Sequence, residues 1–191
     1  MEIPPVWMAV QTNDLELLKT VLTPENIETR ASEELYTPLM FAANYSYPEL
    51  VEYLIANGAD VNAQSSSGMT PLMLAMNPFA ETTQLCVTKL IDAKADINLQ
   101  SAGGSTALME AAHKGMLRQV LTLLMAGAKI NAQNKYGETA LMVASMKDGE
   151  PAVVKELLDA GADKSLFDVD GSTAIDIAKR CESTAICTML E

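Results

Sequence analysis

Apolar residues recur at helical spacing in short stretches of this chain, and polar turns separate the stretches. Leu50 and Val51 are followed by Leu54 and Ile55, which places all four on one face of a helix. A shorter run with small alanines, LMFAA from Leu39, precedes them. The pattern predicts pairs of short helices, in which the first has about two turns and the second carries an apolar stripe.

Two sequence motifs repeat in register along the chain. The first, Thr-Pro/Ala-Leu-Met and its variant TAIDIAK, recurs at spacings of 33, 36, 33 and 34 from Thr37, through Thr70, Thr106 and Thr139, to Thr173. The second, typified by GADVNAQ, recurs at spacings of 36, 33 and 34 from Gly58, through Lys94 and Gly127, to Gly161. Because the two spacings change together, both motifs belong to one repeat of about 33 residues.

The motifs mark the ends of helices. Thr37 and Pro38 predict a helix start, because Thr is a good N-cap and the first helical turn tolerates a residue without an N–H. Gly58 predicts a helix end, since Gly readily takes the left-handed conformation there. A polar turn that contains Asn62 then leads into the next repeat. Each repeat is therefore predicted to be a helical hairpin with a projecting turn.

This repeat resembles the ankyrin repeat, which joins a β-turn to two helices over 33 residues and carries a T-P-L-H-x-A signature. The resemblance covers nearly the whole chain. It implies an all-α ankyrin-repeat solenoid of about six stacked helix-turn-helix units with projecting β-turns, whose end repeats act as caps. We expect a single domain over 1–191, with an N-terminal cap at 1–31, full repeats at 32–64, 65–100, 101–133 and 134–167, and a C-terminal cap at 168–191.

The chain departs from the family pattern in several places. The family's usual histidine is replaced by Met40, Met73, Met109 and Met142, and by Asp176 in the last repeat. We expect the methionines to fill gaps in the core. Lys94 stands at a helix-terminal glycine position, so either it takes the left-handed conformation or the helix ends differently. Leu35 replaces a turn glycine, which leaves the shape of that turn open. An insertion over 77–84 predicts an irregular segment with an exposed Phe.

Composition and charge narrow the classes of function. The 191 residues are 49% hydrophobic and 20% charged, which is enough for one good-sized core. The 13 Lys and Arg against 25 Asp and Glu give a net charge of −12, which argues against binding to nucleic acid or to an anionic membrane. We find no transmembrane segment or signal peptide in the sequence. We expect a cytoplasmic monomer, with a secreted effector or a trimmed leader as alternatives.

Few residues point to catalysis or metal binding. His113 is the single histidine, and we expect it to face outward and contact a partner rather than hold a metal. Cys86, Cys181 and Cys187 are odd in number, which favours buried free thiols. The sequence therefore predicts no enzyme, no cofactor and no metal site. An enzyme or a small-ligand protein would need a closed pocket with converging polar groups.

The asparagines of the second motif are Asn62, Asn98 and Asn131. We expect each to hydrogen-bond the backbone of a tight turn. In some animal ankyrin proteins the matching asparagine is hydroxylated, so the resemblance leaves such a modification open.

The resemblance also implies that a concave face, formed by the turns and the first helices, binds another folded protein. The positions that match the family's variable contacts are Glu33, Glu34, Tyr36, Asn44, Tyr45, Ser66, Ser67, Met69, Asn77, Ser105, Glu110, His113, Lys114, Lys135, Tyr136, Glu138, Met146, Lys147, Asp170 and Ser172. Tyr36, Tyr45 and Tyr136 are the preferred anchors, because tyrosine offers a large amphipathic area with few rotatable bonds.

Charge is distributed unevenly along the chain. Residues 1–60 hold 10 acids and 2 bases, a net −8, whereas residues 101–133 hold 1 acid and 3 bases, a net +2. We expect a protein partner with a basic surface to dock toward the N-terminal end. The sequence predicts a non-catalytic protein-interaction module that serves as an adaptor or a stoichiometric inhibitor. The alternative is a bacterial ankyrin effector that acts on a host protein.

Overall fold

The computed structural model describes residues 4–31, 33–146 and 150–191. Over these residues the regular secondary structure is helical, apart from an isolated antiparallel bridge between Ala31 and Tyr36. The chain divides into two compact units, Met1–Asp96 and Ile97–Glu191. We call them the N-terminal unit and the C-terminal unit and describe each by itself.

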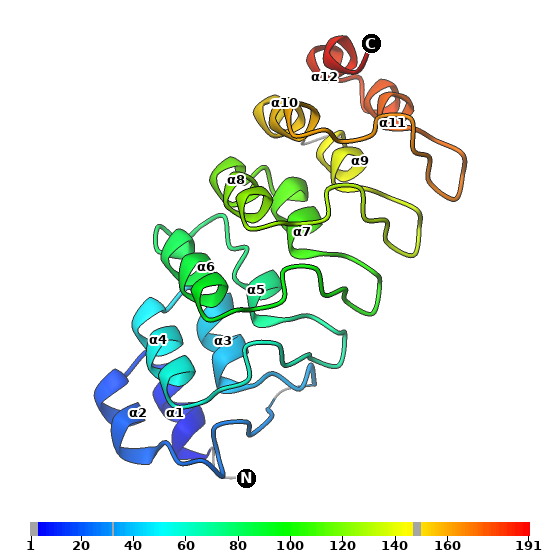
Figure 1. The fold of residues 1–191 in the computed structure, drawn as a ribbon. Coiled ribbons are helices and arrows are strands. Elements are labelled where there is room, and N and C mark those ends of the chain that lie inside the picture. Colours follow the sequence, from blue (N-terminus) through cyan, green and yellow to red (C-terminus); the bar gives the residue numbers. More distant parts are fainter. Residues whose placement is uncertain (1–3, 32, 147–149) are drawn as a thin grey trace. The chain divides into compact units, whose positions relative to one another are not determined.

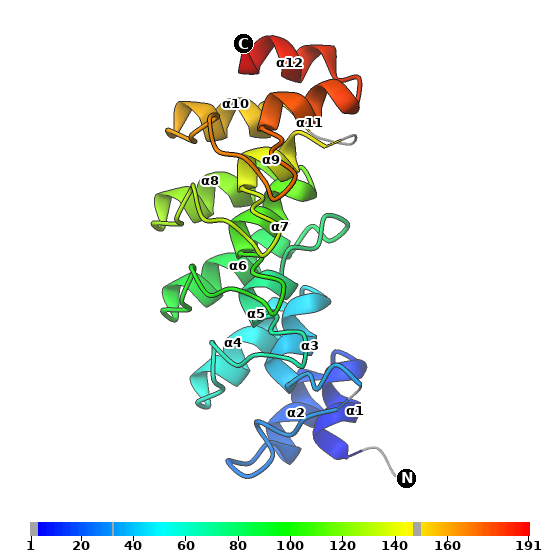
Figure 2. The ribbon, with the colours of Figure 1, turned by 90° about the vertical axis from the view of Figure 1, so that its right-hand side faces the viewer.

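The N-terminal unit contains three helical hairpins (Figure 1). Their helices are α1 (Pro5–Gln11) with α2 (Leu15–Val21), α3 (Pro38–Asn44) with α4 (Pro48–Ala56), and α5 (Pro71–Leu74) with α6 (Thr83–Asp92). The first helices of neighbouring hairpins pack together, since α3 contacts both α1 and α5. The second helices do the same, since α4 contacts α2 and α6. Within this unit the long turns between hairpins extend to the same side of the helices, which Figure 2 presents to the viewer.

The C-terminal unit repeats this arrangement. Its hairpins are α7 (Ala107–His113) with α8 (Leu117–Met125), α9 (Ala140–Ala144) with α10 (Pro151–Asp159), and α11 (Ala174–Arg180) with α12 (Thr184–Leu190). Here α9 contacts α7 and α11, and α10 contacts α8 and α12. Both units thus have the all-helical hairpin architecture that the repeat pattern predicts.

Threonine caps start the first helices as predicted. The backbone N–H groups of Met40, Met73, Met109 and Met142 donate to the Oγ1 atoms of Thr37, Thr70, Thr106 and Thr139, over 3.2 to 3.3 Å. The last repeat uses a different cap, in which a carboxylate oxygen of Asp176 accepts from the Thr173 N–H at 3.0 Å and from its hydroxyl at 2.6 Å. These hydrogen bonds lower the pKa of Asp176.

The methionines that replace the family's histidine lie in the core. Met40, Met73, Met109 and Met142 are each at most 3% exposed. The prediction that they belong to the core is confirmed by this burial. Met40 forms a buried cluster with Ala63 and Leu74, which lie outside its own helix.

The chain takes a left-handed backbone after each second helix of the full repeats. Glycine serves at Gly58, Gly127 and Gly161, with φ of 92°, 91° and 90°. Lys94 holds the same position with φ of 66°, so the helix ends in the same way despite the side chain. Leu35 also has a positive φ, 55°, and its turn is closed by two backbone hydrogen bonds of 3.0 Å between Ala31 and Tyr36. Both positions accept a side chain at a cost of about 1 to 2 kcal/mol in backbone strain.

The three cysteines are free thiols, but they are not all buried. Cys86 is fully buried on α6, and burial raises its pKa to about 12, with a smaller contribution from the negative charge of Glu49. Cys181 and Cys187 are only partly buried, so the prediction of buried thiols is wrong for this pair. In the described structure α11 and α12 are covered by helices on one side, by α9 and α10, which leaves their outer side accessible.

Candidate functional site

A row of aromatic rings lies on the first helices of the N-terminal unit. Phe41 and Tyr45 are four residues apart at the end of α3, so they share one face of that helix, and their rings stack with centroids 4.5 Å apart. Trp7 of α1 meets Phe41 edge to face, with centroids 5.8 Å apart and planes at 88°. On the other side, Tyr47 extends the row, 5.9 Å from Tyr45. Three of the four rings thus come from one short stretch of chain.

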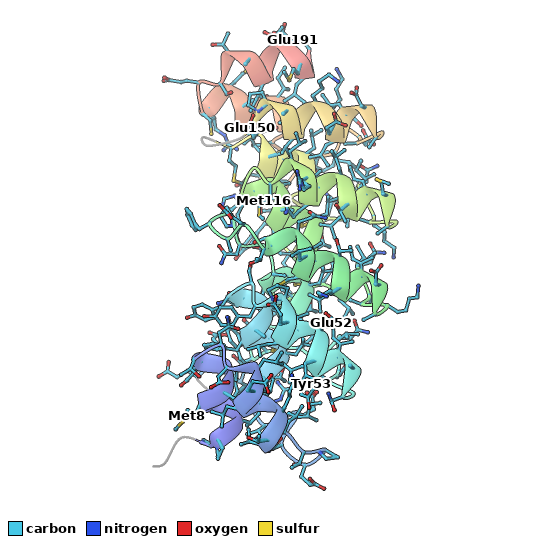
Figure 3. The ribbon with its side chains drawn as sticks, turned by 90° about the vertical axis from the view of Figure 1, so that its left-hand side faces the viewer. Met8, Glu52, Tyr53, Met116, Glu150 and Glu191 are labelled. Carbon is cyan, nitrogen blue, oxygen red and sulfur yellow. The ribbon has the colours of Figure 1, made fainter. Side chains whose placement is uncertain are left out.

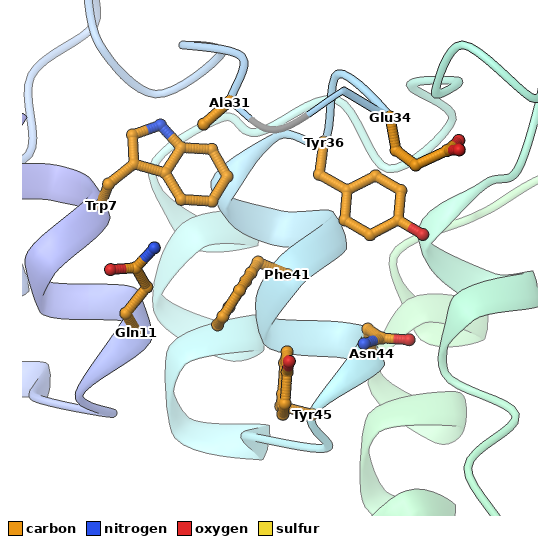
Figure 4. Close-up of a pocket in the computed structure, with 8 residues that line it drawn as sticks. All are labelled: Trp7, Gln11, Ala31, Glu34, Tyr36, Phe41, Asn44 and Tyr45. Atoms are coloured by element: carbon orange, nitrogen blue, oxygen red, sulfur yellow. The ribbon is translucent and has the colours of Figure 1, made fainter. Parts of the chain in front are cut away.

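The rings of Trp7, Phe41 and Tyr45 border a hollow of about 300 Å³ (Figure 4). Its lining consists of Trp7, Gln11, Ala31, Glu34, Tyr36, Phe41, Asn44 and Tyr45. We call this feature the aromatic hollow. The six-membered ring of Trp7 lies toward Tyr36 and Phe41, and its indole nitrogen lies on the opposite edge (Figure 4). That nitrogen is buried and has no hydrogen-bond partner in the described part of the chain.

The turn between α2 and α3 places an acidic group at the rim of the aromatic hollow. Glu34 lies on one side of the left-handed Leu35 and Tyr36 on the other. The Glu34 carboxylate accepts hydrogen bonds from the hydroxyls of Ser66 at 3.1 Å and Ser67 at 2.9 Å, which hold it in place. The pKa of Tyr36 is raised, first by burial and then by the negative charges of Glu34 and Tyr45.

Several of the predicted contact residues of this unit also support the structure. Tyr36 and Met69 are partly buried against a small cluster formed by Met40, Ala63 and Leu74. The side chain of Asn77 donates to the backbone oxygen of Asn44 at 3.2 Å. Glu33, Ser66 and Ser67 are exposed in the turns, and Tyr45 is 50% exposed.

The loop that carries the insertion is irregular between α5 and α6, as predicted, and it projects from the helices (Figure 2). Its base is fixed to the neighbouring hairpin, where Thr82 Oγ1 donates to the Ser46 backbone oxygen at 2.6 Å and the Ser46 and Thr83 hydroxyls lie 3.0 Å apart. Phe79 at its tip is 94% exposed. The exposed Phe is therefore confirmed.

In the described part of the C-terminal unit, the predicted contact residues do not border a comparable group of rings. His113 and Lys114 are exposed at the end of α7, as expected, and Lys114 pairs with the partly buried Glu110 at 3.8 Å. Tyr136 is 63% exposed at a turn tip beside exposed Lys135. The remaining predicted positions are exposed at Asp170 and partly buried at Ser105, Glu138, Met146 and Ser172. Lys147 lies outside the described residues.

Side-chain hydrogen bonds join successive turns within each unit. The predicted asparagines form hydrogen bonds with the backbone of a turn, as expected. The turn in question belongs to the following repeat. The side-chain oxygens of Asn62, Asn98 and Asn131 accept from the N–H groups of Asp96, Lys129 and Asp163, over 2.8 to 2.9 Å. Glu28 accepts from the Asp60 N–H at 2.8 Å in the same way. We call this set of bonds the turn ladder.

The side away from the turns carries the second helices. Figure 3 shows Glu52 and Tyr53 of the N-terminal unit on this side, on α4. Lys89 of α6 forms an ion pair with Glu52 there. The described residues contain no cluster of His, Cys, Asp and Glu that could hold a metal ion. Of the helices described, none is long and apolar enough to cross a membrane.

Sequence reasoning missed part of the aromatic hollow. Trp7, Gln11, Ala31 and Phe41 line it but were not among the predicted contacts. One signal could have located Trp7, since it precedes the left-handed Asn13 by six residues, just as Met40 precedes the left-handed Ser46. An indole therefore occupies the register position that a buried methionine fills in the full repeats.

The model of a known protein family matches most of the chain. It describes ankyrin repeats, in three copies, and matches residues 6–101, 79–168 and 108–190. The crystal structure of EF0377, an ankyrin repeat protein, covers 100% of this chain and is itself covered over 98%, with a TM-score of 0.84 at 30% identity.

Similar curated proteins are longer and diverse. The palmitoyltransferase AKR1 of Lachancea kluyveri is 32% identical over 182 residues, which cover 93% of this chain and 24% of that protein. The ARF GTPase-activating protein Git of Drosophila melanogaster is 35% identical over 86 residues, or 44% of this chain and 11% of that protein. The chain thus spans a quarter or less of the length of these relatives.

Proposed function

This chain belongs to the ankyrin repeat family, and we propose that it is a non-catalytic module that binds a folded protein partner through its turns and first helices. Ankyrin repeats are generally protein-interaction modules. The observation that carries the proposal is the aromatic hollow, whose rings are held in place before any partner arrives. A preformed surface loses little conformational entropy on binding.

The proposed partner has a basic surface. Residues 1–60 carry 10 acids against 2 bases, and the exposed Glu33 and Glu34 lie at the turn beside the aromatic hollow. A field of this sign accelerates association with a basic protein and weakens with added salt. Occupancy of the partner then serves either to recruit it, as an adaptor does, or to block it, as a stoichiometric inhibitor does.

The test compares two tyrosines on opposite sides of the N-terminal unit. We expect immobilised wild-type chain to retain a protein from lysate, and Tyr45→Ala to weaken its affinity by about 2 kcal/mol, roughly 30-fold, because Tyr45 is an exposed anchor on the turn side. Tyr53→Ala on α4 is the matched control and should retain that protein as the wild type does. The affinity is measured by calorimetry with the purified partner.

Equal retention by the Tyr45→Ala and Tyr53→Ala chains would contradict the proposed surface. Raising the salt concentration, or reversing Glu33, Glu34 and Glu49 to Lys, should weaken the same complex if the partner surface is basic. An affinity that ignores both changes would contradict the basic partner. The partner's own activity, with and without one equivalent of this chain, then separates an inhibitor from an adaptor.

A further inference from the structure

We propose that the aromatic hollow is a receptor for one arginine side chain of the protein partner. The inference rests on the proposed function, since it names the chemistry by which the partner is recognised. The guanidinium group would lie against the ring faces of the hollow, with Glu34 supplying the negative charge at the rim.

The walls of the hollow favour a cation over an apolar side chain. Trp7, Tyr36, Phe41 and Tyr45 supply four aromatic rings. The face of such a ring carries negative quadrupole charge, so it attracts a cation within about 6 Å, and arginine more often than lysine because a planar guanidinium also stacks. A wall of leucine side chains would bury apolar atoms equally well but would not attract a cation.

The charge around the hollow has the matching sign. Glu34 is the charged residue of the lining, and no basic residue is among the eight that form it. The neighbouring base, Arg30, is not part of the lining, and its Nη1 donates to the backbone oxygens of Leu35 at 3.0 Å and Gln64 at 2.7 Å. Burial is the main cause of the raised pKa of Tyr36, and the negative charge of Glu34 adds to it.

The size and the polar rim fit a side chain better than a cofactor. A volume of about 300 Å³ is at the lower end of the range for small-molecule pockets, roughly 300 to 1,000 Å³. Gln11 and Asn44 contribute amide groups along the edge, on either side of Phe41 and Tyr45 (Figure 4).

The chain provides its own reporter for a direct test. Trp7 is the single tryptophan, so the tryptophan emission and the indole ¹H–¹⁵N resonance both come from one residue that lines the aromatic hollow. The probes are the blocked peptides acetyl-Gly-Arg-Gly-amide and acetyl-Gly-norleucine-Gly-amide, which differ in charge at one side chain. We expect the arginine peptide to shift the Trp7 signals saturably, and the norleucine peptide to bind at least about tenfold more weakly.

Two neighbouring glutamates separate local recognition from long-range charge. Glu34→Gln removes the rim charge but keeps an oxygen for Ser66 and Ser67, and we expect it to weaken the arginine peptide about three- to tenfold. Glu33→Gln makes the same change in net charge one residue away, outside the lining, and should alter binding by less than about twofold. Thermal melts of both variants establish that they fold.

Each outcome decides the proposal. Equal binding of the two peptides would overturn it, since the hollow would then be a plain apolar site, and equal effects of Glu34→Gln and Glu33→Gln would overturn the role of Glu34. If neither peptide binds while a partner complex still depends on Tyr45, this inference fails and the proposed function stands. If the arginine peptide binds as expected but no complex depends on Tyr45, the hollow binds arginine, whereas the proposed function and the assignment of that arginine to a partner both fail.

Discussion

The two units of the chain place different residues at their left-handed backbone positions. Where the repeat needs a left-handed residue, the C-terminal unit uses glycine at six described positions and a side chain at one, Glu182. The N-terminal unit uses glycine at Gly58 and Gly68 and side chains at four positions, Asn13, Leu35, Ser46 and Lys94. The architecture of the hairpins is the same, so the fold tolerates either choice.

The difference coincides with the aromatic hollow. Leu35 directly precedes Tyr36, and Ser46 directly follows Tyr45, so two of the strained residues adjoin the two tyrosines of the lining. Strained backbone persists where the surrounding structure holds it in place, and it often lies at functional sites. We read the N-terminal unit as the one that carries a specialised surface, and the C-terminal unit as the more regular of the two.

The largest expected difference between the units is in thiol chemistry. At pH 8 a thiol reagent should label Cys181 and Cys187 in the folded chain and leave Cys86 unlabelled, with a rate at Cys86 more than about a hundredfold below that of the unfolded chain. Mass spectrometry of digests measures the label at each site. Labelling of Cys86 as fast as Cys187 would contradict its burial.

The burial of Cys86 also determines how the stability of the chain changes with pH. The raised pKa of Cys86 means that the folded chain holds its proton up to about pH 12, whereas an unfolded thiol releases its proton near 8.5. The contribution of the buried thiol to stability is therefore complete below pH 8.5 and is lost as the pH rises toward 12. A Cys86→Ala chain, melted alongside the wild type, should lack this part of the alkaline loss.

A smaller effect is expected where glycine is required for space as well as for φ. A Cβ at Gly137 would lie 2.9 Å from the Asp168 Cα, whereas a Cβ at Gly171, with nearly the same φ, meets nothing within 4 Å. We expect Gly137→Ala to lower the free energy of unfolding by about 2 to 4 kcal/mol, and Gly171→Ala by only about 1 to 2 kcal/mol. Urea unfolding measures both, and equal losses would contradict the close approach of the two turns.

The smallest effect is expected from substitutions at Lys94 and Gly127, which hold matching left-handed positions in the two units. Lys94→Gly in the N-terminal unit should relieve left-handed strain and raise the free energy of unfolding by about 0.5 to 1 kcal/mol. Gly127→Lys, at the matching position of the C-terminal unit, should lower it by a similar amount, because nothing lies within 4 Å of a Cβ there. If Lys94→Gly destabilises the chain, the lysine side chain makes contacts that outweigh the strain.

Most of the fold follows from local residues that recur in register. Thr37 and Gly58 act through their own backbone neighbours, so a single repeat already contains the information for its hairpin. The burial of the methionines follows equally well from the repeated motif, because Met40, Met73, Met109 and Met142 all stand three residues after the capping threonine. These predictions needed no knowledge of distant contacts.

The aromatic hollow could be predicted only in part. Tyr36, Asn44 and Tyr45 lie at repeat positions that face the turn side, and the family resemblance found them. Trp7 was missed because its repeat lacks the Thr-Pro-Leu motif that fixes the register, and its approach to Phe41 is a contact between residues 34 apart. The partial exposure of Cys187 likewise depends on which helices cover α12, which no local pattern records.

The turn ladder affects which substitutions the turns of this chain can accept during evolution. Its donors at Asp60, Asp96, Lys129 and Asp163 are main-chain N–H groups, which every amino acid except proline supplies. One of the four positions already holds a lysine where the others hold an aspartate. Mutations at these positions can therefore reverse the charge of a turn while the hydrogen bond between turns is kept, so the charge along the turns can change in evolution without loss of the ladder.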